Sequence, residues 1–141
     1  MNWLFDTCVL SEIIRPKPAL NVIKWIGTIP GENVFISVLT LGELYKGFHK
    51  VADSRKGEKL IKWLETDIIT GFGNRVLPVD KTIVMTWGEL CAEAEIKGRP
   101  RPEIDSLVAA TARVHHLTLV TRNASDFQFT GVPVFNPWLE T

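Results

Sequence analysis

The sequence contains few cysteines and no long apolar segment. Cys8 and Cys91 are the only two cysteines among 141 residues, and neither belongs to a CxxC pair or a Cys/His cluster. This scarcity argues against a structural zinc site or a disulfide framework and is typical of reduced thiols in a cytoplasmic protein. No apolar run approaches the ~18 residues that span a bilayer, and the N-terminus lacks the basic start and apolar stretch of a signal peptide.

The sequence also carries no excess of charge. Its 16 Lys and Arg residues balance 16 Asp and Glu residues, so the formal net charge is zero. A neutral chain has no long-range field that attracts nucleic acid, and such a partner would need a local basic patch. With 45% apolar and 23% charged residues, the composition is that of an ordinary globular protein, and the length fits one domain over residues 1–141.

Short apolar segments alternate with segments of helical periodicity. We predict strands at 2–6, 34–38, 76–80, 118–122 and 132–136. We predict helices at 7–15, 18–29, 40–51, 54–69, 81–98 and 103–116. This order indicates an α/β fold, a three-layer α/β/α sandwich with a mainly parallel central sheet.

Four acidic residues should meet at one edge of this sheet, because ligand sites in such folds lie beyond the carboxyl ends of the strands. Asp6 ends the first predicted strand, and Glu43 lies in the first turn of the helix after the second strand. Asp105 begins a helix that runs back toward the fourth strand, and Asp126 follows that strand. The four carboxylates therefore converge in the predicted topology.

Clustered carboxylates repel one another. Two unit charges 4 Å apart cost about 4 kcal/mol at an effective dielectric constant of 20. A divalent cation would remove this cost, and oxygen ligands without His or Cys suit Mg²⁺ or Mn²⁺. Such an ion can orient a water for attack and stabilise charge on a phosphoryl group.

Two of the acids also have a structural interpretation. Asp6 is suited to cap the short helix that follows it, and Thr40-x-x-Glu43 matches a capping box. Asp80 follows the third predicted strand and directly precedes a long helix. We interpret Asp80 as an N-cap rather than as part of the site.

The other two acids are open to structural roles as well. Asp105 could complement the dipole of its helix, and Asp126 is of a residue type common in turns. However, an acid that heads an inward-packing face is unusual as a surface charge. The neighbours of Asp105 at helical spacing are small and apolar: Val108, Ala109 and Ala112.

With these positions marked, the chain resembles the PIN-domain nucleases, and most of all the VapC-like toxins of type II toxin–antitoxin pairs. Any one matching segment is weak, but together they place the four acids in register and in family order. The segments are "FDTCVLSE" (5–12), "ISVLTLGELYKG" (36–47), "GRPRPEIDSLVAATA" (98–112), "LTLVTRNASDF" (117–127) and "GVPVFNPW" (131–138).

The resemblance implies an endoribonuclease that depends on Mg²⁺ or Mn²⁺. Asp6 and Asp105 would be the principal metal ligands, while Glu43 and Asp126 would bind metal directly or through water and hold the attacking water. The positions that match supporting residues of the family are Thr7, Glu12, Thr121 and Asn123. Cys8 stands where Asn is common, and a thiol cannot make the two-sided hydrogen bonds of an amide, which argues against a polar role there.

The resemblance also implies a homodimer and a cognate antitoxin, whose Arg or Lys could approach the acids. A helical surface around Trp25, Trp63 and Tyr45 could receive that partner, or these rings could be ordinary core. RNA would be held by local cations on the first helix, the "RPRP" loop and the fourth strand. These cations are Arg15, Lys17, Arg99, Arg101 and Arg122.

Three alternatives remain open. A receiver-type phospho-acceptor domain needs adjacent acids after the first strand, whereas Asp6 is followed by Thr7 and Cys8. A phosphatase of the haloacid-dehalogenase kind needs a second Asp at position 8. The third alternative is a catalytically inactive binding module of the same fold. The presence of all four acids is the one sequence feature that argues against it. Which RNA would be cut stays open, because shape and loop contacts decide that choice.

Overall fold

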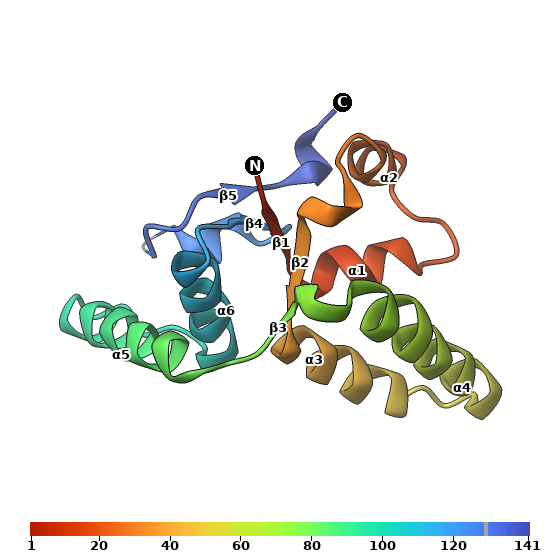
Figure 1. Cartoon of the computed structure of the whole chain (residues 1–141), viewed down its shortest axis with the longest axis horizontal. Helices are drawn as coiled ribbons and strands as arrows, with labels where there is room; N and C mark the ends of the chain where they lie inside the picture. The colour runs from red at the N-terminus through yellow and green to blue at the C-terminus, as the bar shows by residue number, and fades with distance from the viewer. Residues whose placement is uncertain (129) are drawn as a thin grey trace.

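A parallel β-sheet forms the centre of the molecule (Figure 1). The computed structural model describes residues 1–128 and 130–141. Within this part of the chain the sheet has five strands in the order β3-β2-β1-β4-β5, and every neighbouring pair is parallel. The strands are β1 (Trp3–Phe5), β2 (Val34–Ser37), β3 (Val76–Leu77), β4 (Thr118–Val120) and β5 (Val134–Phe135). The predicted parallel sheet is confirmed.

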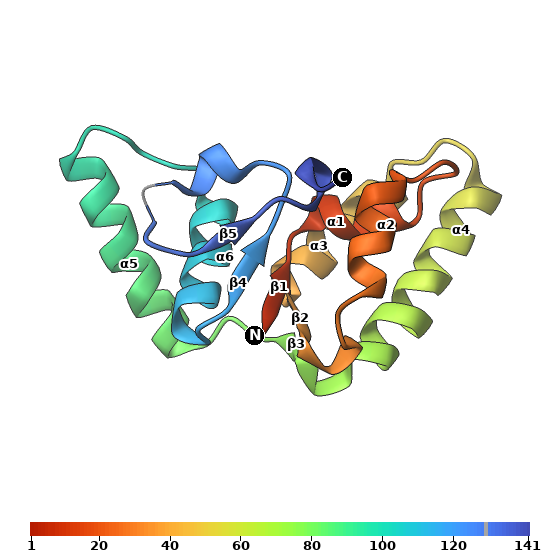
Figure 2. The same cartoon turned by 90° about the horizontal axis from the view of Figure 1, so that it is seen from above.

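Helices cover both faces of the sheet, which confirms the predicted three-layer sandwich. Figure 2 shows α5 and α6 on one side of the strands and α1, α2 and α4 on the other. The helices are α1 (Thr7–Ile13), α2 (Leu20–Gly27), α3 (Val38–His49), α4 (Ser54–Trp63), α5 (Lys81–Ile96) and α6 (Glu103–Val114). Directly after α4, the backbone continues as a π-helical segment, η2 (Leu64–Thr70).

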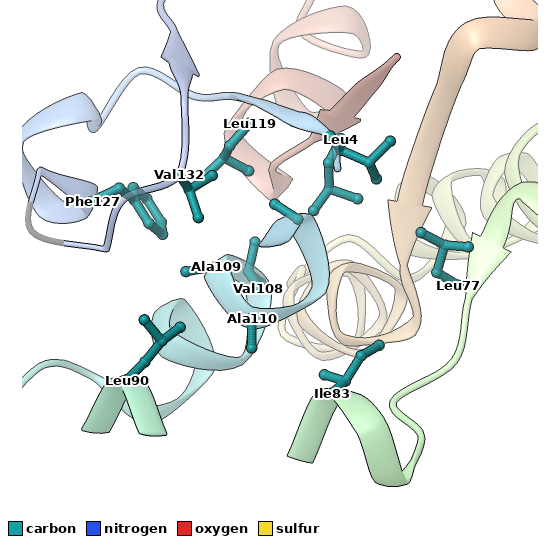
Figure 3. Packing of buried hydrophobic residues seen from close by; sticks show 12 residues of the cluster. Leu4, Leu77, Ile83, Leu90, Val108, Ala109, Ala110, Leu119, Phe127 and Val132 are labelled. Carbon is teal, nitrogen blue, oxygen red and sulfur yellow. The ribbon is translucent and has the colours of Figure 1, made fainter. Parts of the chain in front are cut away.

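Alternate strand residues supply the two halves of the core. Leu4 of β1 and Leu119 of β4 pack with α6 in one cluster, whereas Phe5 and Val120 belong to the cluster on the opposite face. Figure 3 shows the α6 cluster, in which small side chains let the helix approach the strands closely. The prediction that this face of α6 packs inward is confirmed. The three residues at helical spacing from Asp105 are all buried: Val108, Ala109 and Ala112.

Two of the three aromatic residues considered as a partner surface belong to the core instead. Trp25 stacks on Phe135 with ring centroids 4.6 Å apart, and Trp63 meets the ring of Phe48 at 6.3 Å. Tyr45 lies outside the core, with 48% of its surface exposed. Trp25 and Trp63 are only partly buried, but both pack against the buried cluster on the α1 face of the sheet.

The helix after β2 begins two residues earlier than predicted. Ser37 is its N-cap, with Oγ accepting from Leu39 N at 3.1 Å, so α3 starts at Val38. The predicted capping box of Thr40 and Glu43 is therefore wrong. Thr40 is fully buried inside the helix, and Glu43 lies in the second turn rather than the first.

The interpretation of Asp80 is confirmed. Its Oδ1 accepts from Ile83 N at 3.0 Å, and α5 begins at the next residue. Within residues 1–128 and 130–141, no helix combines the length and apolar character that a bilayer crossing requires.

Candidate active site

Asp6 stands at the junction of β1 and α1 and is only 9% exposed. Its N–H donates to Val120 O at 3.0 Å, which extends the pairing of β1 with β4. Its Oδ1 accepts from Thr7 N at 2.8 Å, and the residue is the N-cap of α1. The capping interpretation of Asp6 is therefore correct, and capping leaves the carboxylate at the carboxyl edge of the sheet.

Two threonines fix the carboxylates of Asp6 and Glu43. The fully buried Thr121 donates from Oγ1 to Asp6 Oδ2 at 2.8 Å and accepts from Asn123 N at 3.1 Å. Thr7 Oγ1 donates to Glu43 Oε1 at 2.6 Å. Asp6 is thus held from both sides by donors, and Glu43 is tied to the first residue of α1.

Asp105 brings the acidic group together. Burial raises the pKa of its carboxyl, and the negative charges of Asp6, Asp126 and Glu43 raise it further, in that order. Within the described part of the chain, no hydrogen bond to the Asp105 side chain is found. The other three predicted acids therefore lie close enough for their charges to act on Asp105, although all four come from separate segments of the chain.

Three of these acids share an open pocket of about 460 Å³. Asp6, Glu43 and Asp105 line it, whereas Asp126 lies outside its wall and acts on Asp105 through its charge. The other lining residues are Thr7, Cys8, Ser11, Glu12, Arg15, Arg122, Asn123 and Trp138. The pocket thus combines carboxylates with two arginines and an indole.

Position 8 makes polar contacts, contrary to the argument from the sequence. Cys8 Sγ accepts from Arg122 N at 3.4 Å and lies 3.5 Å from Thr121 Oγ1 and 3.9 Å from Asp6 Oδ2. Burial, and then the charge of Asp6, raises the pKa of the Cys8 thiol. The sulfur thus accepts a backbone N–H of Arg122 and lies beside the Thr121 hydroxyl that donates to Asp6.

Glu12 is tied to partners inside the protein. The residue is 3% exposed, and Arg15 Nη1 lies 3.1 Å from each of its carboxylate oxygens. Trp138 Nε1 donates to Oε1 at 3.0 Å, and Ala19 N donates to Oε2 at 3.4 Å. The indole hydrogen bond is the main reason that the pKa of Glu12 lies below its usual range.

Trp138 and Ser11 are the two pocket residues that the sequence did not single out, and Trp138 makes the more informative contacts. Trp138 follows the short strand β5, in the turn η5 (Pro137–Leu139), far in sequence from α1. Its only sequence signal is its place at the end of the matching segment "GVPVFNPW". No spacing rule links it to Glu12, 126 positions earlier.

The predicted RNA-binding cations are distributed unevenly. Arg15 and Arg122 line the pocket, and the Arg122 guanidinium lies 5.5 Å from the centroid of the Trp138 ring. The guanidinium of Arg101 donates to the backbone carbonyl of Asp126. Lys17 is exposed, and Lys17, Arg99 and Arg101 are not among the lining residues.

The donor set fits a hard divalent cation. The pocket offers carboxylate oxygens without imidazole. The pKa of Asp105 is raised first by burial and then by the three neighbouring negative charges, and a cation would offset those charges. Within the described residues, no three acidic, His or Cys side chains are close enough to enclose a metal as they lie. An ion bound here would therefore keep several waters, as Mg²⁺ usually does.

Comparison with known families decides the affiliation. The model of the PIN domain matches residues 3–130. The chain belongs to the PIN domain family. Within this family it is a VapC-like toxin, since it is 35% identical to toxin FitB of Neisseria gonorrhoeae, over 96% of this chain and 97% of that protein. It is also 31% identical to the tRNA(fMet)-specific endonuclease VapC of Shigella flexneri, over 93% of each chain.

Solved structures agree with this PIN domain assignment. The crystal structure of FitAcB from Neisseria gonorrhoeae superposes with a TM-score of 0.92 at 34% identity, covering 97% of this chain and 99% of that chain. The structure of FitAB bound to a DNA fragment gives a TM-score of 0.92 at 32% identity, covering 99% and 97%. The PIN fold seen here is therefore that of proteins solved as toxin–antitoxin complexes.

Proposed function

We propose that the chain is a metal-dependent endoribonuclease that acts as the toxin of a toxin–antitoxin pair. The observation that carries the proposal is the half-buried carboxyl of Asp105, which meets the charges of Asp6, Asp126 and Glu43 at the edge of an open pocket. Such repulsion costs stability unless a cation offsets it. Relatives named as a VapC ribonuclease and a tRNA(fMet)-specific endonuclease support RNA as the substrate.

Asp6 and Asp105 would hold Mg²⁺ or Mn²⁺, which, when bound, lowers the pKa of a coordinated water and offsets charge on the phosphate. The chain's own residues set the geometry. Thr7 N and Thr121 Oγ1 fix the two oxygens of Asp6. Glu43 has one oxygen held by Thr7, so its other oxygen can accept a proton from the attacking water.

Asp126 would act with Glu43 in holding the attacking water, since its charge reaches Asp105. Arg122 lines the same pocket and would contact the RNA backbone as a cation. Thr121 and Asn123 serve Asp6 indirectly, through the hydrogen bonds of the Thr121 hydroxyl. Glu12 acts on the wall of the pocket rather than on the reacting atoms.

We also propose a cognate antitoxin as a protein partner, a homodimeric toxin and a cytoplasmic location. Structures titled as FitAB and VapBC complexes support the antitoxin. A PIN-fold module that binds RNA without cutting it is the main alternative. A ribonuclease would cleave bound RNA when a divalent cation is supplied, whereas a binding module would leave the RNA intact.

The decisive experiment uses the purified chain, free of any partner, with mixed cellular RNA and Mg²⁺ or Mn²⁺. We expect cleavage that EDTA abolishes and that Asp6→Asn or Asp105→Asn lowers at least about a hundredfold. Asp80→Asn is the matched control, because Asp80 caps a helix outside the pocket. Equal cleavage by wild type and both site variants would refute the proposal.

A further inference from the structure

The pocket lined by the acids also contains an aromatic ring that the proposed cleavage chemistry does not use. Besides the acids, the pocket is lined by Arg15, Arg122 and Trp138. The chain places two cations and a flat aromatic ring in the same open hollow as the carboxylates.

The indole ring of Trp138 is held firmly in place. Its Nε1 donates to the buried Glu12, its backbone N donates to Asn136 Oδ1 at 2.9 Å, and its carbonyl accepts from Asn21 Nδ2 at 2.7 Å. Glu12 is 3% exposed, so the ring is anchored to the interior rather than resting on the surface. A ring fixed in this way loses little freedom when a second planar group stacks on it.

Arg122 contacts both Cys8, which lies beside Asp6, and Trp138. Its backbone N donates to Cys8 Sγ beside Asp6, and its carbonyl accepts from Asn136 Nδ2 at 3.3 Å. Its guanidinium lies 5.5 Å from the centroid of the Trp138 ring. The backbone of Arg122 thus contacts Cys8 near the acids, and its guanidinium lies over the Trp138 ring, where it offers a cation and a planar face.

We propose that Trp138 and Arg122 form a stacking subsite for one unpaired nucleotide of the RNA, in the same pocket as Asp6, Glu43 and Asp105. This inference rests on the proposed ribonuclease function. Unpaired bases stack on aromatic rings and on guanidinium planes, and arginines contact the neighbouring phosphates. A base inside a duplex has both faces covered, so the subsite selects single-stranded segments or loops.

The test is a scan of single-stranded oligoribonucleotides in which one base at a time is removed. With Mn²⁺, we expect removal of one base near the cut to lower kcat/KM of the wild type about tenfold. Trp138→Gln, which loses the ring but keeps an N–H donor, should remove this dependence on the base. Trp138→Phe keeps a ring without the donor and should preserve the dependence, and so should Glu12→Gln.

The outcomes separate this inference from the proposed function. If Trp138→Gln lowers cleavage of the intact and abasic strands by the same factor, Trp138 has only a structural role and the inference fails. The inference also fails if duplex and single-stranded RNA are cut equally, or if no base removal matters, as expected of a peptide-binding site. If the wild type cuts no RNA at all, the ribonuclease proposal itself fails.

Discussion

The hydroxyl of Thr7 donates a 2.6 Å hydrogen bond to Glu43 Oε1, across 36 positions of the sequence. The backbone N–H of Thr7 also donates to Asp6 Oδ1. One small residue therefore sets the relative position of two acids that belong to different helices. Hydrogen bonds to a charged group contribute about 1.5–3 kcal/mol, which is enough to hold a flexible glutamate.

Two substitutions of Thr7 should distinguish the contribution of this hydrogen bond from the contribution of side-chain packing. We expect Thr7→Val, which keeps the shape but removes the hydroxyl, to lower kcat about tenfold because Glu43 loses its position. Thr7→Ser keeps the donor and is the matched control. Steady-state cleavage of RNA with Mn²⁺ is the measurement, and equal rates for the Val and Ser variants would contradict the prediction.

Metal-free stability should improve when the acidic group loses a charge. The pKa of Asp105 is raised in the folded protein, so its ionised form destabilises the fold. This carboxyl contributes stability below its unfolded pKa, about 3.9, and the contribution is lost as the pH rises through the raised folded pKa. Asp105→Asn should therefore raise Tm at pH 7 in EDTA, by about 2–4 °C for each kcal/mol of repulsion relieved.

The wild type and Asp105→Asn also test whether the acidic group binds a divalent cation. Adding Mg²⁺ should raise the Tm of the wild type more than that of Asp105→Asn, because only the wild type presents the full set of carboxylates. The Tm advantage of the variant in EDTA should disappear near pH 3, where the wild-type carboxyl is protonated in both states. A variant that is less stable than the wild type in EDTA at pH 7 would show that the ionised Asp105 does not destabilise the fold.

Arg101 should act through Asp126 rather than only through RNA. Its guanidinium donates to the backbone carbonyl of Asp126, so Arg101→Gln should loosen that turn and lower kcat more than it raises KM. A double-mutant cycle with Asp126→Asn is the check. We expect strongly non-additive losses, whereas an arginine that simply binds phosphate would give additive ones.

Asp80→Ala should affect stability alone. The side chain caps α5 through Ile83 N, and losing such a cap costs about 1 kcal/mol. Urea denaturation should show this loss, while the cleavage rate of the folded variant stays within about twofold of the wild type. A large loss of activity at full folding would place Asp80 in the site after all.

The position of the acids could be predicted because it depends on chain order more than on packing. Parallel strands with helical crossovers bring the ends of β1 and β4 to one edge, whatever the side chains between them. Asp6 follows β1 and Asp126 follows β4 by a few residues. Their proximity to Asp105 therefore follows from topology, while their roles in catalysis stay predictions.

The contacts that depend on side-chain packing could not be predicted. Ser37 and Thr40 both suit a helix start, and only the structure shows that Ser37 caps α3 while Thr40 is buried. The bond between Glu12 and Trp138 joins segments with no periodic relationship. The contact of Cys8 with Arg122 N depends on local backbone geometry, which the sequence does not reveal.

The order of strands in the sheet also determines when the pocket can form during synthesis of the chain. β1 lies between β2 and β4, and its partner β4 begins only at Thr118. A chain still emerging from the ribosome, or one cut short before that strand, lacks the neighbour whose Thr121 hydroxyl steadies Asp6. Incomplete copies therefore carry three of the acids without the hydrogen bond that orients Asp6, and the four acids can come together only near the end of translation.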